Sequence, residues 1–360
     1  MSRKNIFLIT TSVVVISAIA ILGGTGFQIG DKPIAQIFNK KSACDIKPKA
    51  REFKQKPYYS GPLIDAHVHM PTPSKIVGSV AGRFGFAMPV LGGNLTIDYI
   101  TCLFESEGIK KAVGFYIVPR FADGIVARAV KKYEKQHPGK IAAFFMPPPI
   151  NFLNLGIDTI KDIFTKHKGL FKGVGELRGD FENAQNLESP YFEALFKMAE
   201  QNNQIVMIHP NRRQRDVVEG LLEKYPKITF LFHGGREEEW VADIFDKYDN
   251  FYYSLDANLV PLYGWNREHI SDEPTKEEFL AYFRENFNAR LGREVDRWKW
   301  KIEAHPERFV WGTDRWYEWH FDLEVGGLLE EFGRSFIGRL SGVAKENFAY
   351  KNAERMLGGR

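Results

Sequence analysis

The sequence predicts a (β/α)8 barrel that follows a hydrophobic N-terminal segment and a linker. From residue 62 onward, short apolar runs alternate with segments of helical periodicity, as in the βαβ units that build a parallel sheet. Eight such pairs occur, which is the number that closes a barrel, and a doubly wound open sheet is the alternative. The 360 residues, 44% of them hydrophobic, are enough for one large core.

The chain begins with an apolar run. Residues 6–22 contain no charged residue, and Arg3 and Lys4 precede them. This length is near the minimum for a membrane span, and the basic residues predict that the amino end stays in the cytoplasm. We interpret residues 1–27 as a signal peptide or an uncleaved membrane anchor. The remainder is then exported and periplasmic or otherwise extracytoplasmic, tethered to the membrane if the anchor is uncleaved.

A linker and a single domain follow. Residues 28–61 are rich in Lys, Pro and polar residues and show no period, whereas residues 62–360 form the predicted barrel domain. Residues 1–61 carry ten Lys and Arg against three Asp and Glu, which leaves 39 basic and 42 acidic residues beyond them. A weakly acidic domain lacks the basic face that nucleic acid requires. We therefore expect a small-molecule substrate, no nucleic acid, and membrane contact only through the N-terminal segment; the oligomeric state is not predicted.

Cys44 and Cys102 are the only two cysteines of the chain. Export would allow a disulfide between them, but sequence alone does not give the geometry that a disulfide needs. Neither cysteine has the surroundings of a catalytic nucleophile.

The expected strands are short apolar runs, several of which end in a polar residue. They cover residues 63–69, 111–118, 141–146, 173–178, 205–209, 228–233, 251–256 and 309–314. The expected helices between and after them cover residues 97–107, 125–136, 159–167, 191–202, 212–224, 237–247, 277–302 and 324–339. The charged segment 284–303 predicts a solvated helix face.

Two connections are long for this fold, residues 70–95 after the first strand and 257–275 after the seventh. In a barrel both lie over the C-terminal ends of the strands, where active sites are built. We expect them to form lids or substrate walls.

The first strand carries three polar groups on one face. Asp65, His67 and His69 are spaced two residues apart, and the side chains of a strand alternate between its faces, so all three point the same way. Taken alone, a pair of histidines with this spacing is equally consistent with a metal site and with two histidines that bind no metal.

Four further strands end in groups that bind metals or move protons. They contribute Glu176 and Arg178, His209, His233, and Asp314. A single histidine that closes an apolar strand is more often a core residue. Imidazoles and carboxylates from five strand ends that converge on one barrel mouth are instead what zinc or a similar divalent ion requires.

This order of motifs resembles the amidohydrolase superfamily of metal-dependent TIM-barrel hydrolases, and within it the amidohydrolase-related branch that includes lactonases and aromatic-acid decarboxylases. The motifs are DAHVH at 65–69, an acidic residue on the fourth strand, a histidine on the fifth, HGG at 233–235 and GTD at 312–314. The segment 345–358 is similar to the C-terminal helix of that branch. The resemblance covers about residues 62–358.

The resemblance implies a ligand set. His67, His69 and Asp314 would bind a first divalent ion, with zinc as the expected metal, and His209 would be a further ligand in one-metal members. In two-metal members His209 and His233 serve the second ion. Glu176 fits the members in which a glutamate bridges two ions, but an ion pair of Glu176 with Arg178 or another cation is the structural alternative.

The chemistry of such a site assigns further roles. Asp314 would take a proton from the attacking water, and His233 would stabilise charge on the substrate oxygen. Arg178 lies two residues beyond Glu176 and could clamp a substrate carboxylate. Aromatic residues around the eighth strand suit a cyclic or planar substrate and equally suit core packing; they are Trp311, Trp316, Tyr317 and Trp319.

Three functions fit these observations. The first is a metal-dependent hydrolase that cleaves an ester, lactone or amide-type bond of a small substrate. The second is a metal-dependent, non-oxidative decarboxylase of an aromatic acid. The third is a non-catalytic binding barrel that keeps its metal for stability.

Overall fold

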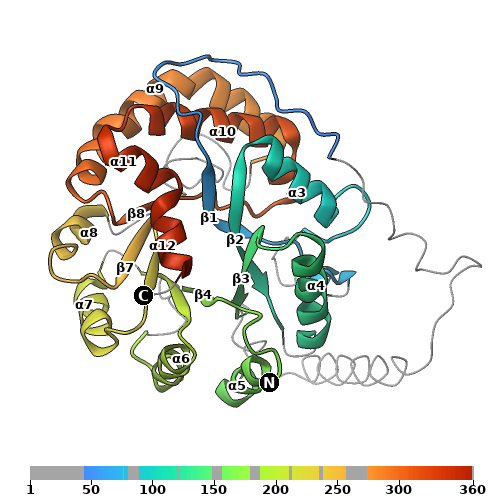
Figure 1. Ribbon diagram of the computed structural model, residues 1–360, viewed down its shortest axis with the longest axis vertical. Coiled ribbons are helices and arrows are strands. Elements are labelled where there is room, and N and C mark those ends of the chain that lie inside the picture. Colours follow the sequence, from blue (N-terminus) through green and yellow to red (C-terminus); the bar gives the residue numbers. More distant parts are fainter. Residues whose placement is uncertain are drawn as a thin grey trace, which may run out of the picture. The chain divides into compact units, whose positions relative to one another are not determined.

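The computed structural model describes residues 44–75, 77–79, 89–119, 122–147, 156–178, 187–210, 213–234, 238–256 and 274–358. These residues form eight parallel strands with helices around them, so the predicted (β/α)8 barrel is confirmed (Figure 1). The predicted signal or anchor segment lies outside the described residues, as do residues 257–273 of the second long connection and residues 80–88 of the first.

The strands follow one another around the sheet in sequence order, each parallel to the next. Four of them have the predicted bounds, and the others differ by one to three residues at an end. The strands are β1 Leu63–His69, β2 Ile109–Ile117, β3 Ile141–Met146, β4 Gly173–Arg178, β5 Ile205–His209, β6 Phe230–His233, β7 Phe251–Leu255 and β8 Phe309–Trp311.

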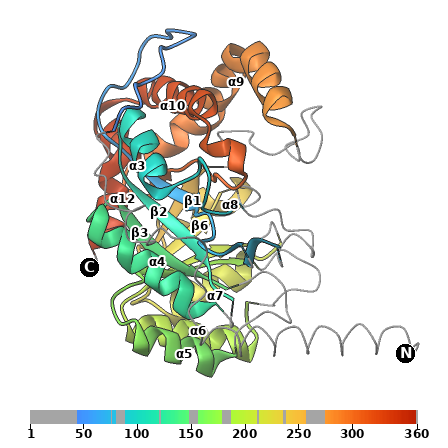
Figure 2. The ribbon, with the colours of Figure 1, turned by 90° about the vertical axis from the view of Figure 1, so that its right-hand side faces the viewer.

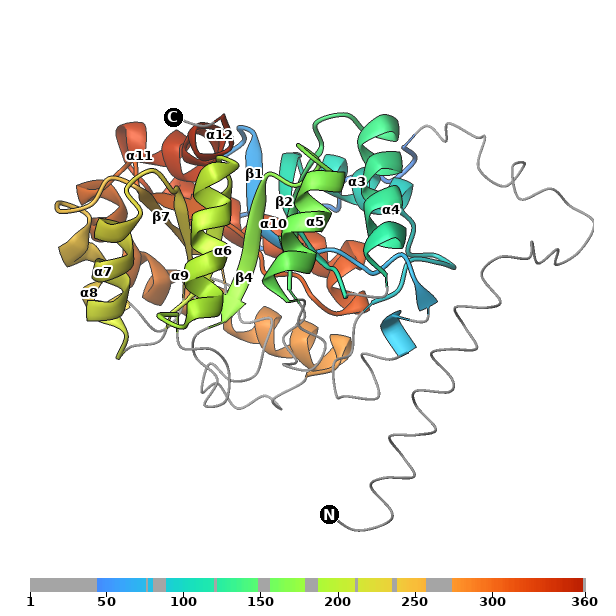
Figure 3. The same cartoon turned by 90° about the horizontal axis from the view of Figure 1, so that it is seen from below.

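The helices stand around the strands (Figures 1 and 3). The bounds are α3 Ile97–Ser106, α4 Asp123–Gln136, α5 Ile157–Lys166, α6 Pro190–Gln201, α7 Arg215–Lys224, α8 Glu238–Ile244, α9 Lys276–Ala304 and α10 Leu323–Gly338. A short 3-10 helix, Glu318–Phe321, precedes α10. The C-terminal turns are α11 Gly342–Glu346, a π-helical turn Asn347–Lys351 and α12 Asn352–Gly358.

The barrel closes between β1 and β8 through a few specific hydrogen bonds. The Thr313 hydroxyl and amide donate to the two carboxylate oxygens of Asp65, at 2.6 and 3.0 Å. The Asp314 amide donates to the His67 carbonyl at 2.8 Å, and the His69 amide donates to the Arg315 carbonyl at 2.9 Å. These bonds close the barrel at the residues predicted to bind metal.

Residues 44–61 pack against the barrel domain. Glu331 of α10 accepts hydrogen bonds from the amides of residues 52, 53 and 54. Phe53 stacks on Phe287 of α9, and a disulfide joins Cys44 to Cys102 of α3. The second half of the predicted linker is therefore an ordered strap over α3, α9 and α10.

The longest helix, α9, agrees with one expectation in part. It lies beside α10 (Figures 1 and 2), and the charged segment 284–303 was expected to be solvated. Arg290, Glu294 and Lys301 are nevertheless buried, and so is Trp298. These side chains are buried because α9 packs against α10 and against the seventh and eighth strands, with Trp298 beside Tyr253 and Phe309. The other face of the segment is solvated as expected, with Glu285, Arg293, Asp296 and Arg297 exposed. Among the described helices, none has both the length and the hydropathy to cross a bilayer.

Candidate metal centre

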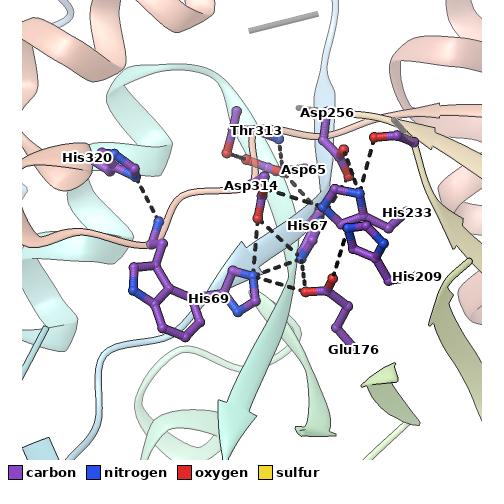
Figure 4. Close-up of polar contacts among 12 residues, drawn as sticks. Asp65, His67, His69, Glu176, His209, His233, Asp256, Thr313, Asp314 and His320 are labelled. Atoms are coloured by element: carbon purple, nitrogen blue, oxygen red, sulfur yellow. Dashed lines mark hydrogen bonds and ion pairs between the residues drawn. The ribbon is translucent and has the colours of Figure 1, made fainter. Parts of the chain in front are cut away.

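The structure brings six predicted side chains together at the C-terminal ends of the strands (Figure 4). All six are at least nine-tenths buried. They lie on or directly after β1, β4, β5, β6 and β8. The residues are His67, His69, Glu176, His209, His233 and Asp314.

Three of these residues form the tightest group. Nε2 of His67 is 3.1 Å from Nε2 of His69, and Oδ1 of Asp314 is 3.1 Å from His69 Nε2 and 3.5 Å from His67 Nε2. A tetrahedral zinc ion with ligands at about 2.0–2.1 Å separates its ligand atoms by roughly 3.3 Å. The three distances therefore match one face of a zinc coordination tetrahedron.

A neighbouring carboxylate fixes the orientation of His67. Asp256 follows β7, is fully buried, and its Oδ2 lies 2.9 Å from His67 Nδ1. A carboxylate there holds the proton on Nδ1 and leaves the Nε2 lone pair for a metal, as outer carboxylates do in zinc sites. Nδ1 of His233 similarly donates to the Gly234 carbonyl at 3.1 Å, which directs His233 Nε2 toward Asp314 at 3.3 Å.

Glu176 lies on the other side of the histidine pair. Its Oε2 is 3.6 Å from His69 Nε2 and 3.9 Å from His67 Nε2, and its Oε1 is 3.7 Å from His209 Nε2. Oε1 is buried and accepts no hydrogen bond from a described residue. A buried carboxylate oxygen without a donor is costly unless a cation lies near it.

Ligand atoms that lie within 4.8 Å of one another form two groups, His67–His69–Asp314 and His67–Glu176–His233. His67 belongs to both, but only its Nε2 is available because Nδ1 is bonded to Asp256. His209 belongs to neither group and instead stacks on His233, with ring centroids 4.2 Å apart. Imidazoles and carboxylates are ligands that zinc prefers, and the first group offers three such ligand atoms for one ion.

The histidines and carboxylates also set one another's charge. Burial opposes ionisation of Asp314, but His67 together with hydrogen bonds from His233 and His69 holds the pKa of Asp314 well below its usual range. Burial likewise disfavours a charged His67 or His233. The surrounding carboxylates nevertheless raise the pKa of both, Asp314 first for His67 and Asp256 first for His233. The carboxylates thus favour the protonated forms of His67 and His233, whereas burial lowers the pKa of His69.

The backbone of Asp314 is unusual. Its φ of 53° lies in the left-handed region that non-glycine residues rarely adopt. The hydrogen bonds of Thr313 to Asp65 and of the Asp314 amide to His67 hold it there. Strained residues of this kind cluster at functional sites.

The Arg178 side chain lies outside the described part, so neither its predicted clamp role nor its ion pair with Glu176 is tested. His320 is described and buried, and its Nδ1 accepts the amides of Trp316 and Tyr317. His320 therefore holds the backbone of the loop after β8 in its conformation. Trp316 packs edge-on against His69, with ring centroids 4.5 Å apart, at the mouth of the barrel.

The sequence interpretation missed Asp256. A signal existed, since this acidic residue ends the seventh predicted strand, the same position from which the other site residues were chosen. Its role depends on contact with His67, 189 residues away in the chain, and no local pattern reveals that contact.

Comparisons with solved structures agree with this fold. A zinc-bound amidohydrolase from Burkholderia multivorans aligns at 13% identity and TM-score 0.55, covering 83% of this chain and 100% of that one. A structure of amidohydrolase II aligns at 15% identity and TM-score 0.51, covering 82% and 99%. No family model matches the sequence, and no curated protein matches it. The chain thus has the TIM-barrel fold found in amidohydrolase structures, as the resemblance of its motifs implied.

Proposed function

We propose that the protein is a metal-dependent hydrolase of the amidohydrolase type, which activates water to cleave an ester, lactone or amide-type bond of a small substrate. One observation carries the proposal: the ligand atoms of His67, His69 and Asp314 lie 3.1–3.5 Å apart, which is the spacing that a single zinc ion imposes. The fold shared with a zinc-bound amidohydrolase supports it.

A divalent ion at this position would lower the pKa of a bound water molecule and polarise the substrate carbonyl. The chain's own residues then handle the protons. Oδ1 of Asp314 faces the histidine pair and its Oδ2 faces His233, so this carboxylate is placed to accept the proton of the attacking water and return it to the leaving group. A pKa held well below the usual range keeps Asp314 ionised, which a carboxylate ligand of a metal must be.

His233 has the complementary role. Its Nδ1 is held by the Gly234 carbonyl and its pKa is raised by the carboxylates around it, chiefly Asp256 and Glu176 despite burial. Its Nε2 can therefore carry a proton toward the centre of the site. We infer that it stabilises the negative charge that develops on the substrate oxygen.

Glu176 supports a second ion. Its Oε1 faces His209, lacks a hydrogen bond from the described residues, and belongs to a carboxylate whose other oxygen faces the first ligand group. An ion held by Glu176, His209 and His233 would compensate this buried charge. His233 would then be a ligand, and the ion would stabilise the substrate oxygen in place of a protonated His233. The expected zinc content is two per chain, falling to one in Glu176→Ala. One ion in both proteins would instead make Glu176 a substrate-binding or structural residue.

The substrate class follows from the walls of the mouth. Trp316 beside His69 provides an aromatic wall that suits a cyclic or planar substrate. Arg178 stays a proposed partner of a substrate carboxylate, because it ends β4 next in register to His209.

An assay of the zinc-loaded full chain against esters, lactones, amides and aromatic carboxylic acids tests the function. The proposal expects hydrolysis of at least one ester, lactone or amide, and loss of that hydrolysis in His67→Ala. Carbon dioxide release without a hydrolysis product would identify a decarboxylase. Tight ligand binding without turnover across the panel would identify a binding barrel. His305→Ala is the matched control, since His305 lies at the C-terminal end of α9 near Asp246.

We further propose that the protein works outside the cytoplasm. The apolar run at residues 6–22 supports export, and the disulfide between Cys44 and Cys102 is of a kind that persists in oxidising compartments. Fractionation of cells that express the full chain should find it outside the cytoplasm, whereas a cytoplasmic protein with reduced cysteines would contradict the proposal.

A further inference from the structure

The loop after β8 brings an aromatic side chain to the metal centre. Its backbone is bonded to β1 as far as Arg315, whose carbonyl accepts the His69 amide at 2.9 Å. The next residue, Trp316, is half-buried, and its ring lies at 71° to the ring of His69, with centroids 4.5 Å apart. Trp316 therefore borders the metal centre at the mouth of the barrel.

One imidazole nitrogen holds the backbone of this loop. Nδ1 of His320 accepts the amide of Trp316 at 2.8 Å and that of Tyr317 at 3.2 Å. His320 is fully buried and lies apart from the metal ligands, beside the loop (Figure 4). Backbone amides that are shielded from water need an acceptor, so removing this one would leave two donors without it. A side chain outside the metal centre thus fixes the backbone of Trp316.

His320 can accept these two hydrogen bonds only as a neutral imidazole. Burial holds the pKa of His320 well below its usual range; Arg315 and His69 act in the same direction, and Asp314 opposes them. The neutral ring then carries its proton on Nε2 and presents the lone pair of Nδ1 to the loop.

Neighbouring helices fix the turn that carries His320. Trp319 packs edge-on against His320, with ring centroids 4.1 Å apart, and its ring also lies 5.4 Å from that of Phe279 of α9. The Tyr99 hydroxyl of α3 donates to the Phe321 carbonyl at 3.0 Å. The turn is therefore held from two sides, and the loop that it supports is held with it.

We propose that His320 is a positioning residue for Trp316, and that this pair makes the site selective for ligands with a planar ring next to the group that meets the metal. Trp316 contacts the ring of the ligand, whereas His320 touches neither ligand nor metal. Two aromatic rings attract each other beyond the area that they bury, which favours a planar ring over an aliphatic group of the ligand. The proposal rests on the proposed function, because the ring belongs to a substrate bound at the metal centre.

Calorimetric titration of the zinc-loaded full chain with acetohydroxamate and benzohydroxamate tests the proposal without turnover. Both probes bind zinc through the same group, and one carries a methyl where the other carries a phenyl. The ratio of their dissociation constants, which we call the ring preference, should fall about tenfold in Trp316→Ala. His320→Leu, which has no acceptor, should lower it by a similar factor. His320→Asn should retain it, because its side-chain oxygen is attached to Cγ as Nδ1 is.

The affinity for acetohydroxamate separates positioning from a general structural role. It should be the same in all these proteins, because the metal ligands are unchanged. His320→Gln gives the same test if His320→Leu does not fold, since its oxygen lies one bond further from the backbone. The proposal is overturned if the variant without the acceptor keeps the ring preference of the wild type, or if it loses affinity equally for both probes.

The same titrations distinguish failure of this proposal from failure of the proposed function. Binding of neither probe by the wild type would contradict the metal centre and this proposal together. Binding of both probes with a ring preference that no variant changes would contradict this proposal alone. The expected ring preferences in a protein that hydrolyses no ester, lactone or amide would support the roles of His320 and Trp316 and contradict only the hydrolase activity.

Discussion

Asp314 and Arg315 are neighbours in the chain but belong to two different buried polar clusters. Asp314 faces the histidines of the metal centre, whereas Arg315 turns the other way and is bidentate to Glu107 at the end of α3, at 3.2 and 2.6 Å. Both side chains are almost completely buried. In both clusters, therefore, the side chains are charged and buried.

The clusters differ in what their charges contact. In the second cluster, which we call the Glu107 cluster, Arg315 pairs with the Glu107 carboxylate and Arg334 donates to the carbonyls of Glu107, Tyr59 and Gly61. Cation and anion therefore satisfy each other within the protein. In the metal centre, carboxylate and imidazole atoms instead converge on one another, and Glu176 Oε1 has no hydrogen-bond donor among the described residues.

The difference shows how a buried ionic cluster can be assigned to stability or to function. Opposite charges paired with each other hold segments together, here the strap before β1, the end of α3 and the loop after β8. Acceptors that converge without a cation predict that a cation arrives from solution. Substitutions in the two clusters should therefore have different consequences.

The largest expected effect is that of Asp314→Asn. It removes the charge of a predicted ligand and proton acceptor, so turnover should become undetectable and zinc affinity should fall. Assays of turnover and zinc titration measure both. Asp243→Asn, on the surface of α8 where Asp243 pairs with Arg215, is the matched control. Full turnover in Asp314→Asn would remove this residue from the mechanism.

Arg315→Met should act on stability instead. It leaves the Glu107 carboxylate buried without its cation, which costs about 3–5 kcal/mol in the free energy of unfolding. The double variant Glu107→Leu with Arg315→Met replaces both charges and should recover most of that loss. Urea unfolding measures the effect. If Arg315→Met unfolds like the wild type but loses zinc, the Glu107 cluster is part of the site and the distinction fails.

Asp256→Asn should have a smaller effect, confined to the metal centre. The amide can no longer hold the proton on His67 Nδ1 as a carboxylate does, and loss of such an outer partner typically weakens metal binding by about 10–100-fold. Zinc competition with a chelator measures this change. Unaltered zinc affinity would show that Asp256 only packs against His67.

The smallest effect is a dependence of zinc affinity on pH. The raised pKa values of His67 and His233, which their carboxylate neighbours impose against burial, mean that zinc must displace protons. Apparent affinity should therefore rise with pH by about tenfold per unit for each proton released. Titrations in buffers of different ionisation enthalpy measure the released protons, and zinc binding without proton release would contradict the stated charge of the metal-free site.

Much of the fold and part of the site could be predicted from local patterns. Alternation of apolar runs with helical periods located all eight strands, and the ends of these strands located His67, His69, Glu176, His209 and Asp314. Both signals can be found in short stretches of sequence. The second is enough to locate the site because the C-terminal ends of parallel strands meet at one end of a barrel.

The other features depend on contacts between distant parts of the chain. Asp256 gains its role from His67, and Arg315 is paired with Glu107 across 208 residues. Three charged residues of α9, Arg290, Glu294 and Lys301, are buried by the helices and strands packed on them. Adjacent residues such as Asp314 and Arg315 can thus have different roles, one in the metal centre and one in stability. Only the three-dimensional structure distinguishes these roles.

Zinc content per chain tests the central claim most directly. Wild type, His67→Ala and His305→Ala would be purified as full chains, loaded with zinc, dialysed and measured by elemental analysis. We expect His305→Ala to retain as much zinc as the wild type and His67→Ala to lose the ion bound by His67, His69 and Asp314. Equal zinc content and turnover in His67→Ala and the wild type would contradict the assignment of this site.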